Sequence, residues 1–211
     1  MHFHSEKRKL TSNPILKINN SLIESVETIK CLGLWLDPHL KWNTHITYLC
    51  KTMSSKAGIL NKLRWILPST ILNLLYHSLV NCHLSYLAGL WGNTSRCYLR
   101  RVEILQERCL KYANKLPQIT PTKILFSAHC KRILNIDNLF FFKICKFIHS
   151  VVNNIVHHNI KFSKTIHNHY TRKRDNLHRP KPMNNYGART ITFMGPQLYE
   201  TIPKSIKDTI S

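Results

Sequence analysis

Apolar residues recur every three or four positions in five successive segments between residues 43 and 156, and this periodicity constrains the fold more than any other feature of the chain. The first segment extends from Asn43 to Leu67. Its apolar positions are Ile46, Leu49, Met53, Ala57, Leu60 and Leu63. Side chains at these spacings share one face of an α-helix. Because helices of this kind bury their apolar faces against each other, the sequence predicts a bundle of about five helices.

Helix-breaking and helix-starting residues separate the five segments. Pro68 ends the first predicted helix, Gly89 and Gly92 interrupt the second, and the third extends to Leu116. Residues that favour helix N-termini precede the other segments. The predicted starts are Ser69 or Thr70, Thr94 or Ser95, Thr120-Pro121, and Asp137.

The two ends of the chain are predicted to be less helical. Ile15 to Ile18 and Thr28 to Leu36 have the composition of two strands, and a lone pair of strands is marginally stable in water. After His157 few apolar residues remain, which predicts a linker or mobile arm, and Thr190 to Met194 is a β-like run before Gly195-Pro196. The predicted fold is mainly α: an N-terminal β-hairpin, a helical bundle, and a basic, partly irregular C-terminal region. The expected divisions are residues 1–40, 41–156, 157–183 and 184–211.

The charge of the chain favours a polyanionic partner. Lys and Arg total 31 against 10 Asp and Glu, which gives a formal net charge of +21. Nucleic acid is the commonest partner of such chains. The alternatives are an anionic membrane surface and a basic protein without a polyanionic partner. We expect nucleic acid, and no membrane, because Lys143 and Lys146 interrupt the most apolar stretch, Leu139 to Val156.

Cysteine usage and the N-terminal residues indicate the compartment. The seven cysteines are odd in number and form no Cys-x-x-Cys pair, which argues against a disulfide framework. The first nine residues contain no apolar core of the kind that a secretory signal peptide has. We therefore expect reduced thiols and an intracellular protein, in the nucleus or the cytoplasm.

Basic residues form rows on two of the predicted helices. Arg101, Arg108 and Lys115 recur every seven residues, so they lie within about 40° of each other on a helix and opposite its apolar stripe. Lys51 and Lys62 share a face of the first helix with Tyr48 and Ser55. Such rows can bind phosphates, although solvated helix faces have the same pattern. A third basic cluster lies near the C-terminus, where only Asp175 opposes Arg172, Lys173, Arg174, Arg179 and Lys181.

Few residues in the sequence suit catalysis or metal binding. Two-metal nucleotidyl transfer needs converging acidic side chains, and the chain has no adjacent acidic pair. Glu103 and Glu107 are explained by helix-stabilising ion pairs with Arg100 and Lys111. Cys145 and His149 have helical i, i+4 spacing, but no second pair with zinc-type spacing accompanies them. We expect no catalytic residue, metal site or cofactor in this chain.

Several short motifs resemble, in order, the C-terminal part of the reverse transcriptases of non-LTR (LINE-type, jockey-like) retrotransposons. The primer grip and the start of the thumb in that family have Lys-x-Leu-Gly-x-x-x-Asp followed by Leu-x-Trp-x-x-His. The matching positions are Lys30, Leu32, Gly33, Asp37, Leu40, Trp42 and His45. Further similarities are residues 2–9, 75–79, 86–92, 105–108, 170–172, Pro180 and 187–203. One departure is Tyr199, where the family usually has Trp, followed by Glu200-Thr201 in place of an Asn-containing pair.

The resemblance implies a palm remnant with the primer grip in residues 1–40, a helical thumb in 41–156, a basic linker and a terminal region. It implies that Leu32 and Gly33 contact a primer–template or RNA–DNA duplex. The Asp-Asp hairpin that holds Mg²⁺ in the intact enzyme would precede Met1, so this chain is expected to bind and not to polymerise. The rival hypothesis is an unrelated basic helical module that binds a protein or a membrane.

Overall fold

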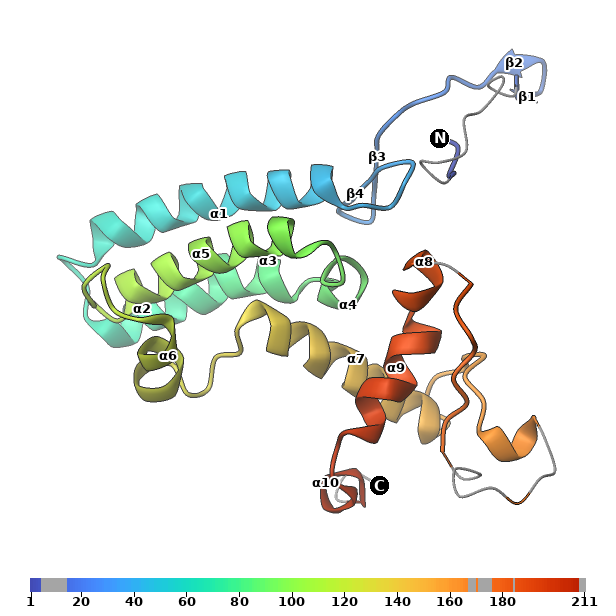
Figure 1. The fold of residues 1–211 in the computed structure, drawn as a ribbon. Helices are drawn as coiled ribbons and strands as arrows, with labels where there is room; N and C mark the ends of the chain where they lie inside the picture. Colours follow the sequence, from blue (N-terminus) through green and yellow to red (C-terminus); the bar gives the residue numbers. More distant parts are fainter. Residues whose placement is uncertain (5–14, 167–169, 171–175, 184, 209–211) are drawn as a thin grey trace. The chain divides into compact units, whose positions relative to one another are not determined.

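The computed structural model describes residues 1–4, 15–166, 170, 176–183 and 185–208 (Figure 1). It is mainly helical with small antiparallel hairpins near the N-terminus, which confirms the predicted fold class. The chain forms two compact units. The first consists of Met1–Tyr86 and Thr94–Ile136, and the second of Leu87–Asn93 and Asp137–Ser211. The boundary at Ile136 therefore differs from the predicted one at residue 157.

The N-terminal strands form two hairpins with two-residue turns. Strand β1 (Lys17–Ile18) pairs with β2 (Ser21–Leu22), and β3 (Ile29–Cys31) pairs with β4 (Leu34–Leu36). The prediction of one strand over Thr28 to Leu36 was wrong, because Leu32 and Gly33 have φ of 46° and 80° and reverse the chain. Positive φ at both central residues suits the right-handed twist of a hairpin, and glycine adopts it without steric cost.

The first unit is built around three helical rods. They are α1 (Asn43–Leu63), α2 (Ser69–Tyr76) continued through a π-helical turn (His77–Asn81) into α3 (Cys82–Ser85), and α5 (Arg96–Ala113). The short helix α6 (Thr122–Ile124) and a second π-helical turn (Leu125–His129) follow. The apolar stripes predicted for the first and third segments contribute to the core, with Ile46, Met53, Leu60, Val102 and Cys109 fully buried. The stripe predicted for the second segment, Leu72, Leu75, Leu79, Cys82 and Tyr86, was wrong beyond Leu72, because Cys82 and Tyr86 are exposed. The fully buried residues there are Leu72, Tyr76, Val80 and Leu84, which are four apart along a rod that contains the π-helical turn.

The C-terminus of α5 differs from the prediction. The helix ends at Ala113, and Lys115 follows it in the left-handed region with φ 55°. The N–H of Leu116 donates to the carbonyl of Lys111 (2.8 Å), and that of Lys115 donates to the carbonyl of Tyr112 (3.2 Å). These two bonds make a Schellman motif, in which glycine usually occupies the place of Lys115. Lys115 is exposed but is not part of the helical row with Arg101 and Arg108.

We expect Lys115→Gly to stabilise the protein by about 0.5–1 kcal/mol, because glycine adopts the left-handed conformation without the penalty that a Cβ imposes. Urea unfolding of both proteins measures the difference. Lys115→Ala is the control, since it removes the charge and keeps the Cβ. Equal stabilisation by both substitutions would assign the effect to charge and contradict the conformational explanation.

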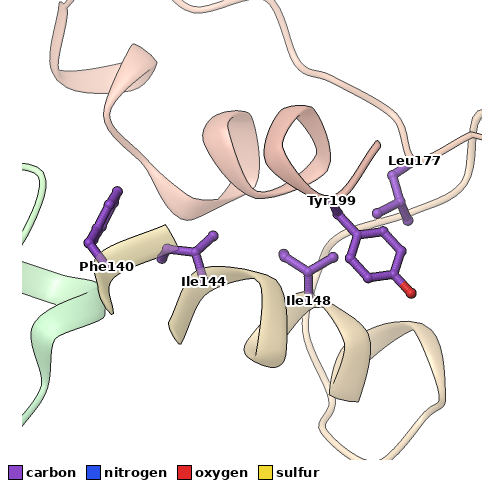
Figure 2. Close-up of a cluster of buried hydrophobic side chains, with 5 residues drawn as sticks. All are labelled: Phe140, Ile144, Ile148, Leu177 and Tyr199. Carbon is purple, nitrogen blue, oxygen red and sulfur yellow. The ribbon is translucent and has the colours of Figure 1, made fainter. Parts of the chain in front are cut away.

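The second unit contains α4 (Ala88–Trp91), α7 (Ile136–Val152), a 3-10 turn (Ser163–Thr165), α8 (Asn185–Ala188), α9 (Ile191–Glu200) and α10 (Lys204–Asp208). Its core lies between α7 and the C-terminal segments (Figure 2). The buried residues of this core are Phe140, Ile144, Ile148, Leu177 and Tyr199.

Two predictions for the C-terminal region were wrong. Thr190 to Met194 is not β-like: Thr190 precedes α9 in an extended conformation, and Ile191, Met194 and Leu198 pack against the core at helical spacing. The segment expected to be a linker also contributes to the core. Phe162 and Leu177 form an antiparallel β-bridge, and Ile160, Phe162 and Leu177 join the apolar cluster.

Candidate nucleic-acid interface

Helices α1 and α5 pack side by side in the first unit and run in the same direction (Figure 1). Near their beginnings, burial raises the pKa of the Cys50 thiol and the Arg101 guanidinium opposes part of that rise. Near their ends, the guanidinium carbon of Arg64 lies 5.2 Å from the centroid of the Tyr112 ring. The cation–π contact and the proximity of Arg101 to Cys50 indicate which sides of α1 and α5 adjoin.

The two predicted basic rows lie on exposed faces of neighbouring helices. Lys51 and Lys62 are exposed on α1, and Arg101 and Arg108 are exposed on α5. At 100° per residue, each pair lies within about 20° on its helix. The arginines lie next to the α1–α5 seam, whereas Lys51 is about 100° around α1 from Cys50 and Lys62 about 160° from Arg64. We call these four residues the basic face. Exposed Ser54 and Gly58 of α1 lie between its lysines and the seam, so only small side chains separate the two rows.

The acidic residues of these helices lie away from the basic face. Helix α1 has no Asp or Glu. On α5, the buried carboxylate of Glu103 pairs with Arg96 (2.7 Å) and Arg100 (3.0 Å), and Glu107 lies 4.0 Å from Arg100. The predicted pairing by Arg100 is confirmed. Lys111 is buried and donates to the carbonyl of Gln118 (2.8 Å), so its predicted ion pair with Glu107 is replaced by this bond in the described structure.

The dimensions of the basic face suit a phosphate backbone. With a rise of 1.5 Å per residue, Lys51 and Lys62 are separated by about 16 Å along α1, and Arg101 and Arg108 by about 10 Å along α5. A strand of duplex DNA carries one charge per about 3.4 Å of axis. The two rows therefore span roughly three to five base pairs.

The Leu32-Gly33 turn is held at the end of the same unit where α1 begins. The Tyr86 hydroxyl donates to the Leu32 carbonyl (2.7 Å), and a Cβ on Gly33 would lie 3.3 Å from the Tyr86 ring. The Leu32 side chain is 80% exposed. On β3, the Lys30 ammonium lies 5.6 Å from the Tyr48 ring of α1 and 5.9 Å from the Trp35 ring. The hairpin is therefore tied to the helices, and its tip is open to a partner.

The C-terminal basic cluster is only partly described. Arg172, Lys173 and Arg174 lie outside the described residues. Lys181 is exposed, but Arg179 forms an ion pair with Glu200 of α9. The expectation that only Asp175 opposes this cluster was therefore wrong, because folding brings Glu200 to Arg179.

One histidine in each unit lies against packed side chains. His45 is 5% exposed, and burial lowers its pKa to about 4, so its imidazole is neutral near pH 7. His149 lies 3.0 Å from the Tyr199 hydroxyl in the second unit. Within the described ranges, no group of three His, Cys, Asp or Glu is placed to hold a metal ion. In those same ranges, no helix combines the length and apolar character that crossing a bilayer requires.

The fold and this surface define a mainly helical protein with a basic face on two parallel helices. No family model matches the chain, and no curated protein or solved structure matches it either.

Sequence reasoning missed one exposed aromatic feature. Trp65 lies in the turn between α1 and α2 and is 77% exposed, with the guanidinium of Arg64 against its ring. The available signal was the position of Trp65 three residues before the helix-ending Pro68 and off the predicted apolar stripe of the first helix.

Proposed function

We propose that this chain binds the sugar–phosphate backbone of duplex nucleic acid through the basic face of α1 and α5. The observation that carries the proposal is the exposure of Lys51, Lys62, Arg101 and Arg108 on two neighbouring helices, of which α1 has no acids and α5 pairs its acids with Arg96 and Arg100. Cations arranged in this way bind phosphates by releasing condensed counterions, without reading base sequence.

The motifs shared with non-LTR reverse transcriptases make an RNA–DNA or primer–template duplex the natural ligand of this proposal. The chain would then be a C-terminal fragment that contains a primer grip and a thumb. Leu32 and Gly33 form an exposed turn, which supports a contact between the grip and a strand. Because the sequence has no adjacent acidic pair, we propose that the chain binds such a duplex and does not extend it.

One observation favours the rival hypothesis of a protein-binding module. The β1–β2 region exposes several large apolar side chains, which is typical of surfaces that another protein covers. They are Ile15, Leu16, Ile18, Leu22 and Ile23. This hypothesis predicts weak nucleic-acid binding that does not depend on the basic face.

Replacement of Lys51, Lys62, Arg101 and Arg108 by Gln tests the proposal. We expect the slope of log K against log salt for duplex binding to fall by up to about 3.6, which is four charges at 0.9 each, whatever the sequence of the duplex. The fold should survive, since exposed substitutions usually change stability by less than about 0.5 kcal/mol. Fluorescence anisotropy at several salt concentrations measures the slope, and thermal unfolding checks the fold.

A matched control separates the effect of the basic face on binding from the effect of net charge. Lys123, Lys131, Arg132 and Lys146 are exposed elsewhere, and their replacement by Gln removes the same charge. The control should keep most of the salt slope. An equal loss of salt slope in both variants would reject the proposed surface. An unchanged slope in the basic-face variant would also reject it, and the tail between Arg172 and Lys181 would then be the next candidate.

A further inference from the structure

Trp65 is held in a fixed, outward-facing position at the end of α1. The guanidinium carbon of Arg64 lies 4.5 Å from the centroid of the Trp65 ring and 5.2 Å from that of Tyr112. Arg64 is thus in cation–π contact with both rings. The N–H of Arg64 donates to the carbonyl of Leu60, and those of Ile66 and Leu67 donate to the carbonyl of Leu63. This turn orders the backbone on both sides of Trp65.

The ring of Trp65 remains available although Arg64 contacts it. It is 77% exposed, whereas Trp91 is fully buried and Trp35 and Trp42 are half-buried. An exposed tryptophan loses little side-chain entropy on binding when its neighbours already restrain it. The arrangement therefore offers a preorganised aromatic surface and not a merely unburied side chain.

The position of Trp65 connects it to the basic face. It follows Lys62 by three residues at the end of α1, and Tyr112 follows Arg108 by four residues, about one turn, on α5. If a duplex on the basic face follows the two helices, its backbone continues toward this end, where the basic rows stop and the aromatic surface begins.

We propose that Trp65, supported by Arg64 and Tyr112, stacks on an unpaired nucleobase where a duplex bound to the basic face continues as a single strand. This inference rests on the proposed function and adds the class of ligand: a duplex with a single-stranded extension. Stacking suits any base because every base has a π-face, so the contact is independent of sequence. A paired base offers no such face except at the end of the helix.

The test compares a short blunt duplex with the same duplex carrying a single-stranded extension, using the full chain. The extension should tighten binding about 5- to 150-fold, which corresponds to about 1–3 kcal/mol for one base–aromatic stack. Trp65→Leu should abolish this preference and lower the affinity for the blunt duplex much less, because the basic face is intact and only the terminal pairs of that duplex offer a face for stacking. Trp65→Phe keeps a ring and should retain part of the preference. The extension should also quench tryptophan fluorescence, and Trp65→Leu should remove that quenching.

The outcomes distinguish the two proposals. If the blunt duplex does not bind through the basic face, the proposed function fails. If it binds but the extension adds nothing, or if Trp65→Leu keeps the preference, the stacking inference is wrong. A membrane role for Trp65 is the remaining alternative. A blue shift of Trp65 emission with anionic phospholipid vesicles, together with no preference for the extended duplex, would overturn the inference in favour of that role.

Discussion

The free energy of unfolding is expected to fall by about 3 kcal/mol between pH 7 and pH 4 because of His45 alone. The side chain is 5% exposed, and burial lowers its pKa from 6.5 to about 4. In this pH range the unfolded chain binds a proton that the folded chain does not. Protonation therefore favours unfolding, so the contribution is complete above about pH 6.5 and is lost as the pH falls toward 4.

Urea unfolding at a series of pH values, for the parent chain and for His45→Gln, measures this contribution. The substitution can change stability at every pH, so the informative quantity is the difference between the two pH profiles. His129→Gln replaces an exposed histidine and is the control, whose profile should parallel that of the parent. Parallel profiles for His45→Gln as well would show that His45 titrates normally in the folded protein.

Gly195→Ala is expected to destabilise the second unit by about 2–3 kcal/mol. Gly195 lies in α9 where that helix crosses α7, and a Cβ there would lie 2.4 Å from Cδ1 and 2.8 Å from Cγ1 of Ile148. Ile148 is fully buried among the core residues drawn in Figure 2, so its side chain would have to shift within the core. Overpacking of this kind typically costs 1–3 kcal/mol. The measurement is chemical unfolding combined with hydrogen-exchange protection of the α7 amides.

Gly58→Ala is the matched control for this substitution. Gly58 also lies in a helix, α1, but no heavy atom lies within 4 Å of its added Cβ, so the change should stabilise the protein by about 1 kcal/mol. Ile148→Ala removes the clashing atoms. In that background Gly195→Ala should cost little, which appears as a coupling energy in a double-mutant cycle. Additive effects of Gly195→Ala and Ile148→Ala would contradict the proposed contact.

The helices of the first unit were predictable because their signals are local. Helix α1 begins at Asn43 as predicted, and the extended Ser95 directly precedes α5. Apolar spacing and Pro68 act within a few residues, so they do not depend on the rest of the fold. The hairpin turn at Leu32-Gly33 was missed, because leucine at the first turn position conceals the signal that glycine gives at the second.

The C-terminal region was mispredicted because its local and tertiary signals disagree. Gly195-Pro196 is a helix-breaking pair in isolation, yet both residues lie inside α9. Gly195 permits the close approach to Ile148, and the apolar side chains of α9 gain burial against α7 that offsets the poor helix propensity. The same applies to Leu177, whose burial depends on a core assembled from distant segments.

The sequence by itself determined the helical class, the net charge of +21 and the basic row on each of two helices. Only the tertiary structure decided that the two rows lie on neighbouring helices, because α1 packs on α5 and the cation–π contact of Arg64 with Tyr112 joins segments far apart in the chain. Local periodicity determines which face of a helix is polar. Packing between helices determines which polar faces become neighbours, and that depends on all the buried side chains together.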